Sequence, residues 1–140
     1  VIHTNLDEGL SDFDEDYFDF VVMTQTVQAM RFPHRLIDEI LRIGREGIVT
    51  FPNMGHWKCR MQFALGRMPV TKHLPNTWYD TPNIHHCTVK DFVETCRDSG
   101  IAIEQAIPLT RGGNTMTLPA TGRLANLLAE QAMFVLRRPD

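Results

Sequence analysis

The sequence predicts an α/β layered fold with a mostly parallel sheet. Two short apolar runs, at residues 18–23 and 48–51, have the pattern of buried strands, and an amphipathic helical pattern separates them. A further helix and strand follow after residue 88, and the chain ends in two strands without a long helix between them. Such an ending indicates an antiparallel edge. With 140 residues, 43% of them hydrophobic, the chain has the size and composition of one domain.

The chain begins with an acidic stretch. Residues 1–20 contain seven Asp and Glu residues and no Lys or Arg, although the net charge of the whole chain is only −3. Residues 7–16 lack apolar periodicity and suit a solvated loop before strand 18–23, which we expect to be buried on both faces. The rest of the chain has no dense basic run, so nucleic acid is not an expected partner.

The first helix and the strand after it follow from residue spacing. Pro33 fits the first turn of a helix, and we expect Gly44 and Gly47 to end it. Strand 48–51 comes next and stops at Pro52, which cannot donate to a sheet ladder. The apolar residues of the helix recur at helical intervals: Leu36, Ile37, Ile40 and Leu41.

The second half contains a helix and two more strands. Thr88 followed by Asp91 is a capping-box pattern that begins a helix. Residues 101–107 alternate between apolar and smaller or polar residues, which predicts a strand. A short helical turn is expected near 124–128, and a last strand at 132–136.

Other features bear on location and completeness. No apolar run approaches the roughly 20 residues that cross a bilayer, so no membrane role is expected. Cys59, Cys87 and Cys96 form neither an even set nor a CxxC pair, which favours a reducing cytoplasm. The chain starts at Val1, without an initiator Met or a leader pattern, so we expect its true N-terminus to be missing.

Several long sequence segments resemble the methionine-biosynthesis family MetW, and together they extend over nearly the whole chain. The resemblance implies a fold like that of class I S-adenosylmethionine-dependent methyltransferases, a Rossmann-like doubly wound sheet with an antiparallel last strand. In that scheme this chain supplies strands 4-5-7-6, and residues 1–6 end the third strand. The matching segments are TQTVQAM at 24–30, IVTFPNMGHW at 48–57, RMPVT at 67–71 and WYDTPNIH at 78–85.

The glycines depart from the methyltransferase pattern. None of them forms the glycine-rich turn that follows the first strand in that family. We therefore expect residues 1–140 to be a single methyltransferase-like domain without its N-terminal cofactor-loop portion. The exposed edge of the fourth strand would make this piece marginally stable, cofactor-free and inactive on its own.

The resemblance implies cofactor contacts after two strands. In the full-length protein, Asn5 and Leu6 would lie against the adenine of S-adenosylmethionine, and Thr24, Gln25 and Thr26 would face its methionine part. Asn5 also suits a simple turn, and Thr24 or Thr26 also suits a helix cap, so both alternatives stay open.

Polar residues also follow strand 48–51. We expect Asn53 and His56 to project at the rim of the cleft, where a neutral His56 is a weak candidate for a general base. A structural role through hydrogen bonds is the alternative for His56, because no nucleophile or carboxylate partner lies at a fixed spacing.

Residues 53–87 form an expected insertion or lid. Trp57 begins an apolar helical stripe that extends to Met68 and suits a lid or a protein contact. The long connection that follows is more typical of a functional loop than of a linker. Its spacing of histidines fits no known metal motif, so no metal is expected, and neither His86 nor Cys59 receives a role. The expected substrate or partner contacts are Asn53, His56, Trp57, Trp78, Tyr79, Asn83 and His85.

Two functions remain open. The resemblance implies a MetW-like protein of methionine biosynthesis that supports homoserine O-acyltransferase, MetX, as its partner. The alternative is an S-adenosylmethionine-dependent methyltransferase that acts on an unidentified small substrate. The first is preferred because the exposed aromatic insertion suits recognition, and self-association is left open.

Overall fold

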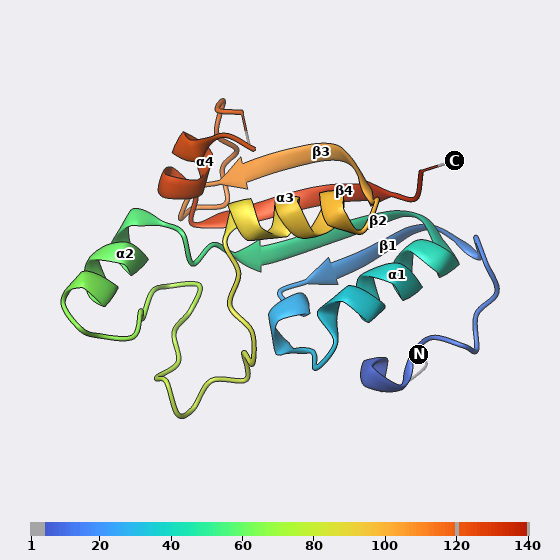
Figure 1. Cartoon of the computed structure of the whole chain (residues 1–140), viewed down its shortest axis with the longest axis horizontal. Coiled ribbons are helices and arrows are strands. Elements are labelled where there is room, and N and C mark those ends of the chain that lie inside the picture. The colour runs from blue at the N-terminus through green and yellow to red at the C-terminus, as the bar shows by residue number, and fades with distance from the viewer. Residues whose placement is uncertain (1–4, 120, 140) are drawn as a thin grey trace.

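A computed structural model describes residues 5–119 and 121–139, and its centre is a four-stranded sheet. The strands are β1 (Phe18–Thr24), β2 (Gly44–Pro52), β3 (Ala102–Leu109) and β4 (Gln131–Arg137), in the order β1-β2-β4-β3 (Figure 1). β1 and β2 are parallel, and β4 is antiparallel to both β2 and β3. The predicted α/β class and strand order are therefore confirmed.

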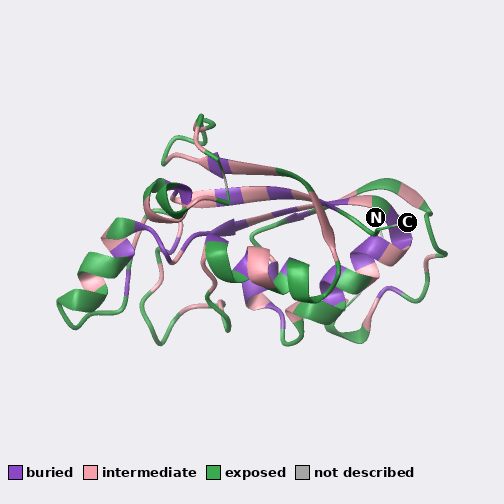
Figure 2. Cartoon of the chain, turned by 45° about the horizontal axis from the view of Figure 1, so that its top comes forward, coloured by how far each residue is buried: buried purple, intermediate pink, exposed green. Residues whose placement is uncertain are grey.

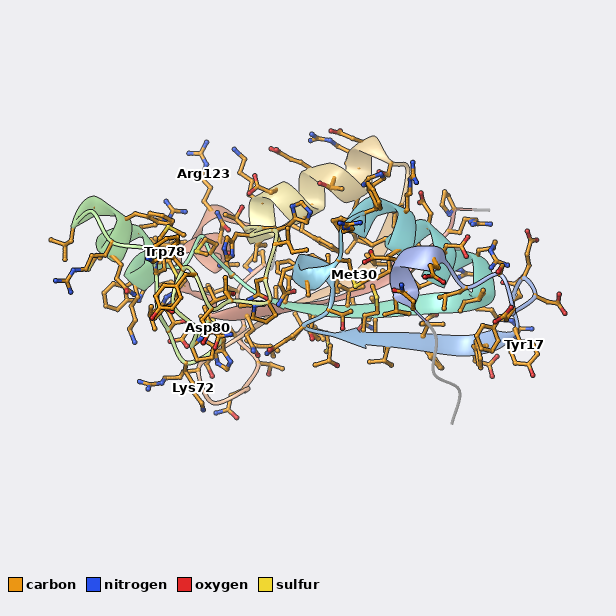
Figure 3. All side chains as sticks on the ribbon, turned by 90° about the horizontal axis from the view of Figure 1, so that it is seen from below. Tyr17, Met30, Lys72, Trp78, Asp80 and Arg123 are labelled. Atoms are coloured by element: carbon orange, nitrogen blue, oxygen red, sulfur yellow. The ribbon has the colours of Figure 1, made fainter. Side chains whose placement is uncertain are left out.

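Two helices cover one face of this sheet. α1 (Pro33–Ile43) and α3 (Val89–Asp98) lie on the same side, as the view from below makes plain (Figure 3). Phe92 of α3 contacts the rings of Phe51 and Phe134, both at 4.8 Å between centroids, and those two rings stack on each other. The buried residues of Figure 2 concentrate in this layer between helices and sheet.

The opposite face of β1 is open, so its predicted burial on both faces is wrong. Phe20 and Val22 are 59% and 61% exposed, while Met23 on the helix side is buried. Within the described residues, α1 and α3 cover only one face, and side chains alternate between the faces of a strand. In the described part of the chain, β1 is also an edge strand, with β2 as its one neighbour.

Glycines set the contact between α1 and the sheet. The prediction that Gly47 ends the first helix is wrong, because β2 begins directly after α1 at Gly44. A Cβ at Gly47 would lie 3.1 Å from Ile40 Cδ1, and one at Gly44 would lie 2.5 Å from Val21 Cγ2. A side chain at Gly44 would therefore force a neighbour to move, and one at Gly47 would be in tight contact with α1, so small residues at both positions let α1 lie close to β1 and β2.

Several boundaries differ from the sequence pattern. Leu6–Glu8 is a short 3-10 turn, η1, rather than the end of a strand, and residues 1–4 of that predicted strand lie outside the described residues. α2 (Trp57–Ala64) is shorter than the predicted stripe, because Gly66 has a positive φ of 75° and the chain turns there. The remaining elements are η2 (Val27–Ala29) and α4 (Arg123–Leu128).

Residues 53–87 extend beyond the carboxyl ends of β1 and β2, as Figure 1 shows. The segment consists of α2 and a long loop that returns to α3. Among the described residues, no helix combines the length and the apolar character needed to cross a bilayer.

Candidate functional site

The candidate site lies where β1 and β2 end and the 53–87 segment begins. In open α/β sheets, ligands bind beyond the carboxyl ends of the parallel strands. Here that edge holds Thr24 at the end of β1, Gln25 and Thr26 after it, and the Asn53 loop after β2. The start of β4 lies beside the same loop, because Asn53 N donates a hydrogen bond to Glu130 O at 2.9 Å.

The turn after β1 has an unusual backbone. Gln25 has a φ of 50°, in the left-handed region that residues other than glycine rarely adopt. Its backbone N donates to Thr50 O at 2.9 Å, which continues the β1–β2 ladder into the turn. Thr24 and Gln25 are exposed. Thr26 makes no capping bond to η2, and its hydroxyl instead donates to Thr24 O at 3.0 Å. Thr26 therefore occupies the N-cap position of η2, as the helix-cap alternative expects, but its side chain makes no capping hydrogen bond.

Asn5 lies in a self-contained turn. Its Oδ1 accepts a hydrogen bond from Asp7 N at 3.2 Å, and its Nδ2 donates to Glu8 Oε1 at 2.9 Å. Leu6 is half-buried and packs against the core. These contacts match the alternative of a turn residue, and the adenine contact of Asn5 and Leu6 stays a prediction.

Asn53 is buried and does not project at a cleft rim as predicted. Asn53 is only 1% exposed, and its side-chain amide makes four hydrogen bonds. Nδ2 donates to the carbonyl oxygens of Asn126 and Ala129, both at 2.8 Å. Oδ1 accepts from Gly55 N and Val89 N. Asn53 thus ties β2, α3 and α4 together because every polar atom of a buried amide needs a partner.

His56 is also buried, so its predicted place at the rim is wrong. It is 4% exposed and serves as the N-cap of α2, with Nδ1 accepting from Lys58 N at 3.4 Å. Burial lowers the pKa of His56, and the nearby Lys58 charge lowers it further, whereas Glu130 opposes the shift. The ring is therefore neutral near pH 7, and its contacts fit the structural alternative.

A polar cluster next to His56 was missed by the sequence analysis. It consists of Lys58, His73, Glu130 and Gln131, which we call the Glu130 cluster. Gln131 Nε2 lies 2.7 Å from His73 Nδ1, and the carboxylate of Glu130 lies 3.8 Å from His73 Nε2. Lys58 Nζ is 3.7 Å from the other carboxylate oxygen. The side chains of His73 and Glu130 are mostly buried, at 15% and 12% exposure.

The Glu130 cluster fastens the 53–87 segment to the sheet. His73 comes from the long loop and Lys58 from α2, whereas Glu130 and Gln131 stand at the start of β4. No sequence spacing could reveal the contacts of His73 with Glu130 and Gln131, because these residues are 57 and 58 positions away along the chain. At the far end of the segment, Ile84 N and His85 N both donate to Gln28 O at 2.9 Å.

Many apolar side chains of the segment are exposed, and we call this set of residues the insertion face. Trp78 and Tyr79 are 73% and 75% exposed and meet edge to face, with centroids 5.6 Å apart. Figure 3 shows Trp78 at the end of the molecule opposite Tyr17. The insertion face comprises Trp57, Met61, Phe63, Leu65, Met68, Val70, Trp78, Tyr79 and Ile84.

The other predicted contact residues lie around this face. Asn83 is half-buried, and its backbone N donates to Thr81 Oγ1 at 3.2 Å. His85 is exposed, with Nε2 3.3 Å from Arg31 O. Cys59 is a buried residue of α2, and burial raises the pKa of its thiol. In residues 5–119 and 121–139, no three His, Cys, Asp or Glu side chains gather as a metal site.

Comparison with known proteins places the chain in a family. The family model described as "Methionine biosynthesis protein MetW" matches residues 1–136. The chain belongs to the MetW family. A curated relative, the bifunctional methionine biosynthesis protein MetXA/MetW of Rhodopirellula baltica, is 31% identical over 109 residues. That match covers 76% of this chain and 18% of the relative.

Solved structures agree on the fold of this MetW-family chain. A SAM-dependent methyltransferase of Thermotoga maritima superposes with a TM-score of 0.63 at 14% identity, covering 96% of this chain and 62% of that one. A second, from Mesorhizobium loti, has a TM-score of 0.53 at 16% identity and covers 90% and 64%. The chain therefore spans less than two thirds of these proteins, and the class I methyltransferase-like fold is confirmed.

Proposed function

We propose that the protein supports homoserine O-acyltransferase, MetX, as a partner in methionine biosynthesis, and that the insertion face makes the contact. The relative from Rhodopirellula baltica is named as a fusion of MetXA and MetW, which supports a physical association of the two activities. The observation that carries the proposal is the pair Trp78 and Tyr79, whose large rings are about three-quarters exposed.

The rest of the insertion face suits a protein contact. Aromatic and Met side chains are enriched at interfaces, where a few large residues supply most of the binding energy. The Glu130 cluster holds the segment at the start of β4, and the two hydrogen bonds to Gln28 O hold its far end at η2. A pre-ordered loop loses less conformational entropy on binding, which favours recognition.

The test measures binding of the full-length protein to its cognate acyltransferase. Replacing Trp78 and Tyr79 by Ala should weaken binding by at least about tenfold, since exposed aromatic anchors carry interface energy. The acyltransferase activity gained on mixing should fall in parallel. Tyr17→Ala is the matched control, because Tyr17 is 63% exposed at the opposite end of the molecule (Figure 3).

Two outcomes contradict different parts of this proposal. If the unaltered full-length protein neither binds the acyltransferase nor raises its activity, the partner role is wrong. If it binds but the Trp78 and Tyr79 variants bind equally well, the partner role stands and the insertion face is not the contact.

A second candidate function is methyl transfer from S-adenosylmethionine. The left-handed backbone of Gln25 favours it, because strain of this kind concentrates at binding sites. Thr24 and Gln25 present exposed polar groups at the strand ends, so they fit the methionine part of the cofactor, whereas Asn5 already uses its amide within its own turn. Bound S-adenosylmethionine would supply the methyl group.

Calorimetry with the full-length protein tests this candidate. S-adenosylmethionine should bind, and Gln25→Pro should weaken binding because proline cannot adopt a positive φ and cannot donate the hydrogen bond to Thr50 O. An unchanged circular dichroism spectrum of the variant shows that the weaker binding does not come from unfolding. A proline control such as Gln105→Pro is unsuitable because it would disturb strand β3. The control is Gln62→Ala on α2, whose side chain hydrogen-bonds to the backbone of Val70. Absence of any binding heat with the unaltered protein would exclude the cofactor.

A further inference from the structure

A cavity of about 560 Å³ lies between the first turn of α3, helix α4 and α2, apart from the insertion face and the Gln25 turn. Its apolar lining consists of Val89, Leu124 and Leu127. Its charged lining consists of Arg60, Lys90 and Arg123, and no Asp or Glu lines it. Figure 3 shows Arg123 projecting from α4 on the helix-covered side of the sheet.

The positive charge around this cavity is not shared by every hollow on the protein surface. The cavity beside η1 and α1 has the opposite character, with four carboxylates and one guanidinium in its lining: Asp7, Glu8, Asp38, Glu39 and Arg35. Three like charges around one hollow repel one another, and an anion placed among them would relieve that repulsion.

The three cations are held differently. Arg60 Nε donates to Gly55 O at 2.7 Å, which fixes the guanidinium group at the cavity wall. Lys90 lies 3.8 Å from Glu94, a solvent-exposed pair one turn along α3 that is weak by nature. For Arg123, no ion pair occurs within the described part of the chain. Two of the three cations are therefore available to a ligand at little cost.

We propose that this cavity binds an organic anion that carries an apolar group. A carboxylate or phosphate would accept hydrogen bonds from Arg60, Lys90 and Arg123, and charge-assisted bonds of this kind are the strong ones. The apolar group would lie against Val89, Leu124 and Leu127. This inference goes beyond the proposed partner role and does not depend on it.

Titration of the full-length protein, followed by amide chemical shifts, tests the ligand class. The probes are hexanoate, hexyl phosphate, inorganic phosphate and hexanol. Hexanoate or hexyl phosphate should bind at least about tenfold tighter than both hexanol and inorganic phosphate, because only they combine charge with an apolar group. The tighter of the two identifies the preferred head group. Hexanol binding as tightly as both anions, or no saturable binding, would overturn the proposal.

Charge-removing variants locate the site. Arg123→Gln and Lys90→Gln should each weaken the tighter anion by about tenfold, with an unchanged circular dichroism spectrum because both side chains are on the surface. Arg97→Gln is the matched control, since Arg97 is an exposed residue of α3 outside the cavity. An equal loss in Arg97→Gln would show a general charge effect and overturn the assignment.

Discussion

At the scale of single residues, Asn53 is the polar side chain of the candidate site that makes the most hydrogen bonds. Its amide joins the loop after β2 to α3 and α4 through four hydrogen bonds. An amide at the end of a strand suggests a ligand contact when only the sequence is known. Burial changes that interpretation, because all of its bonding capacity is directed inward.

Replacing Asn53 by Ala should therefore destabilise the protein strongly. Four backbone groups, three of them in buried hydrogen bonds, would lose their partner, and we expect a loss of about 3 kcal/mol or more in the free energy of unfolding. Urea denaturation measures it. Asn114→Ala, at an exposed turn, should change the free energy by no more than about 0.5 kcal/mol. Similar small effects at both positions would contradict the structural role of Asn53.

His56 predicts a pH dependence of stability. Burial lowers its pKa below the ordinary value of 6.5, so the unfolded chain takes up the proton first as the pH falls. The free energy of unfolding should thus decrease as the pH falls below 6.5 through the lowered pKa. His56→Asn keeps an N-cap residue but removes the titrating ring, so it should reduce this slope.

Urea denaturation at several pH values between about 7.5 and 5.5 compares these slopes. His34→Asn is the control, because it makes the same substitution at an exposed histidine of α1. A slope in His56→Asn equal to that of the unaltered protein would show that His56 does not cause it.

At the scale of elements, the contact between α1 and the parallel strands β1 and β2 depends on glycine. Gly44→Ala would place a Cβ 2.5 Å from Val21 Cγ2 and 3.1 Å from Ile40 O. Either Val21 or α1 must then shift, and we expect a loss of about 1–3 kcal/mol in the free energy of unfolding. Thermal unfolding measures it.

Gly112→Ala provides the comparison for this element. A Cβ there would have Asn114 Nδ2 at 3.6 Å as its nearest neighbour, an ordinary contact. Its unfolding temperature should stay close to that of the unaltered protein. Should Gly44→Ala behave in the same way, the close packing of α1 on β1 would be disproved.

At the scale of the whole molecule, the two ends of the sheet differ in chemistry. The acidic segment with Tyr17 lies at one end, and the insertion face with Trp78 at the other (Figure 3). Between them, the sheet face opposite α1 and α3 presents Phe20 and Val22 to solvent at an edge strand. Exposed apolar strands at an edge promote association between chains.

We expect residues 1–140, expressed alone, to self-associate through this open face. The double change Phe20→Thr and Val22→Thr should lower the apparent mass measured by light scattering, because threonine keeps strand propensity while removing apolar surface. Val70→Thr, on the insertion face, is the control. If the control lowers the mass as much as the β1 changes, association does not proceed through β1.

Local patterns predicted most of the elements correctly. Pro33 and the apolar spacing after it predicted α1, and the Thr88 and Asp91 pair forms the capping box of α3 as expected. These features depend on residues within about one helical turn of each other, so the sequence contains the necessary information. The family resemblance added the strand order and the antiparallel β4.

The candidate site was less predictable. His73 and Glu130 meet only because the 53–87 segment returns to the start of β4, and the amide of Asn53 is buried where it bonds to residues of α3 and α4. Contacts between residues so far apart along the chain leave no periodic signal.

The sequence by itself determined the fold class, the family and the positions of the aromatic and acidic segments, because local propensity and characteristic segments are written along the chain. Only the tertiary structure decided which polar residues face solvent and which are buried and hydrogen-bonded inside the protein. The physical reason is burial: a buried amide or imidazole must bond to groups that folding brings close, and those groups lie far away in sequence.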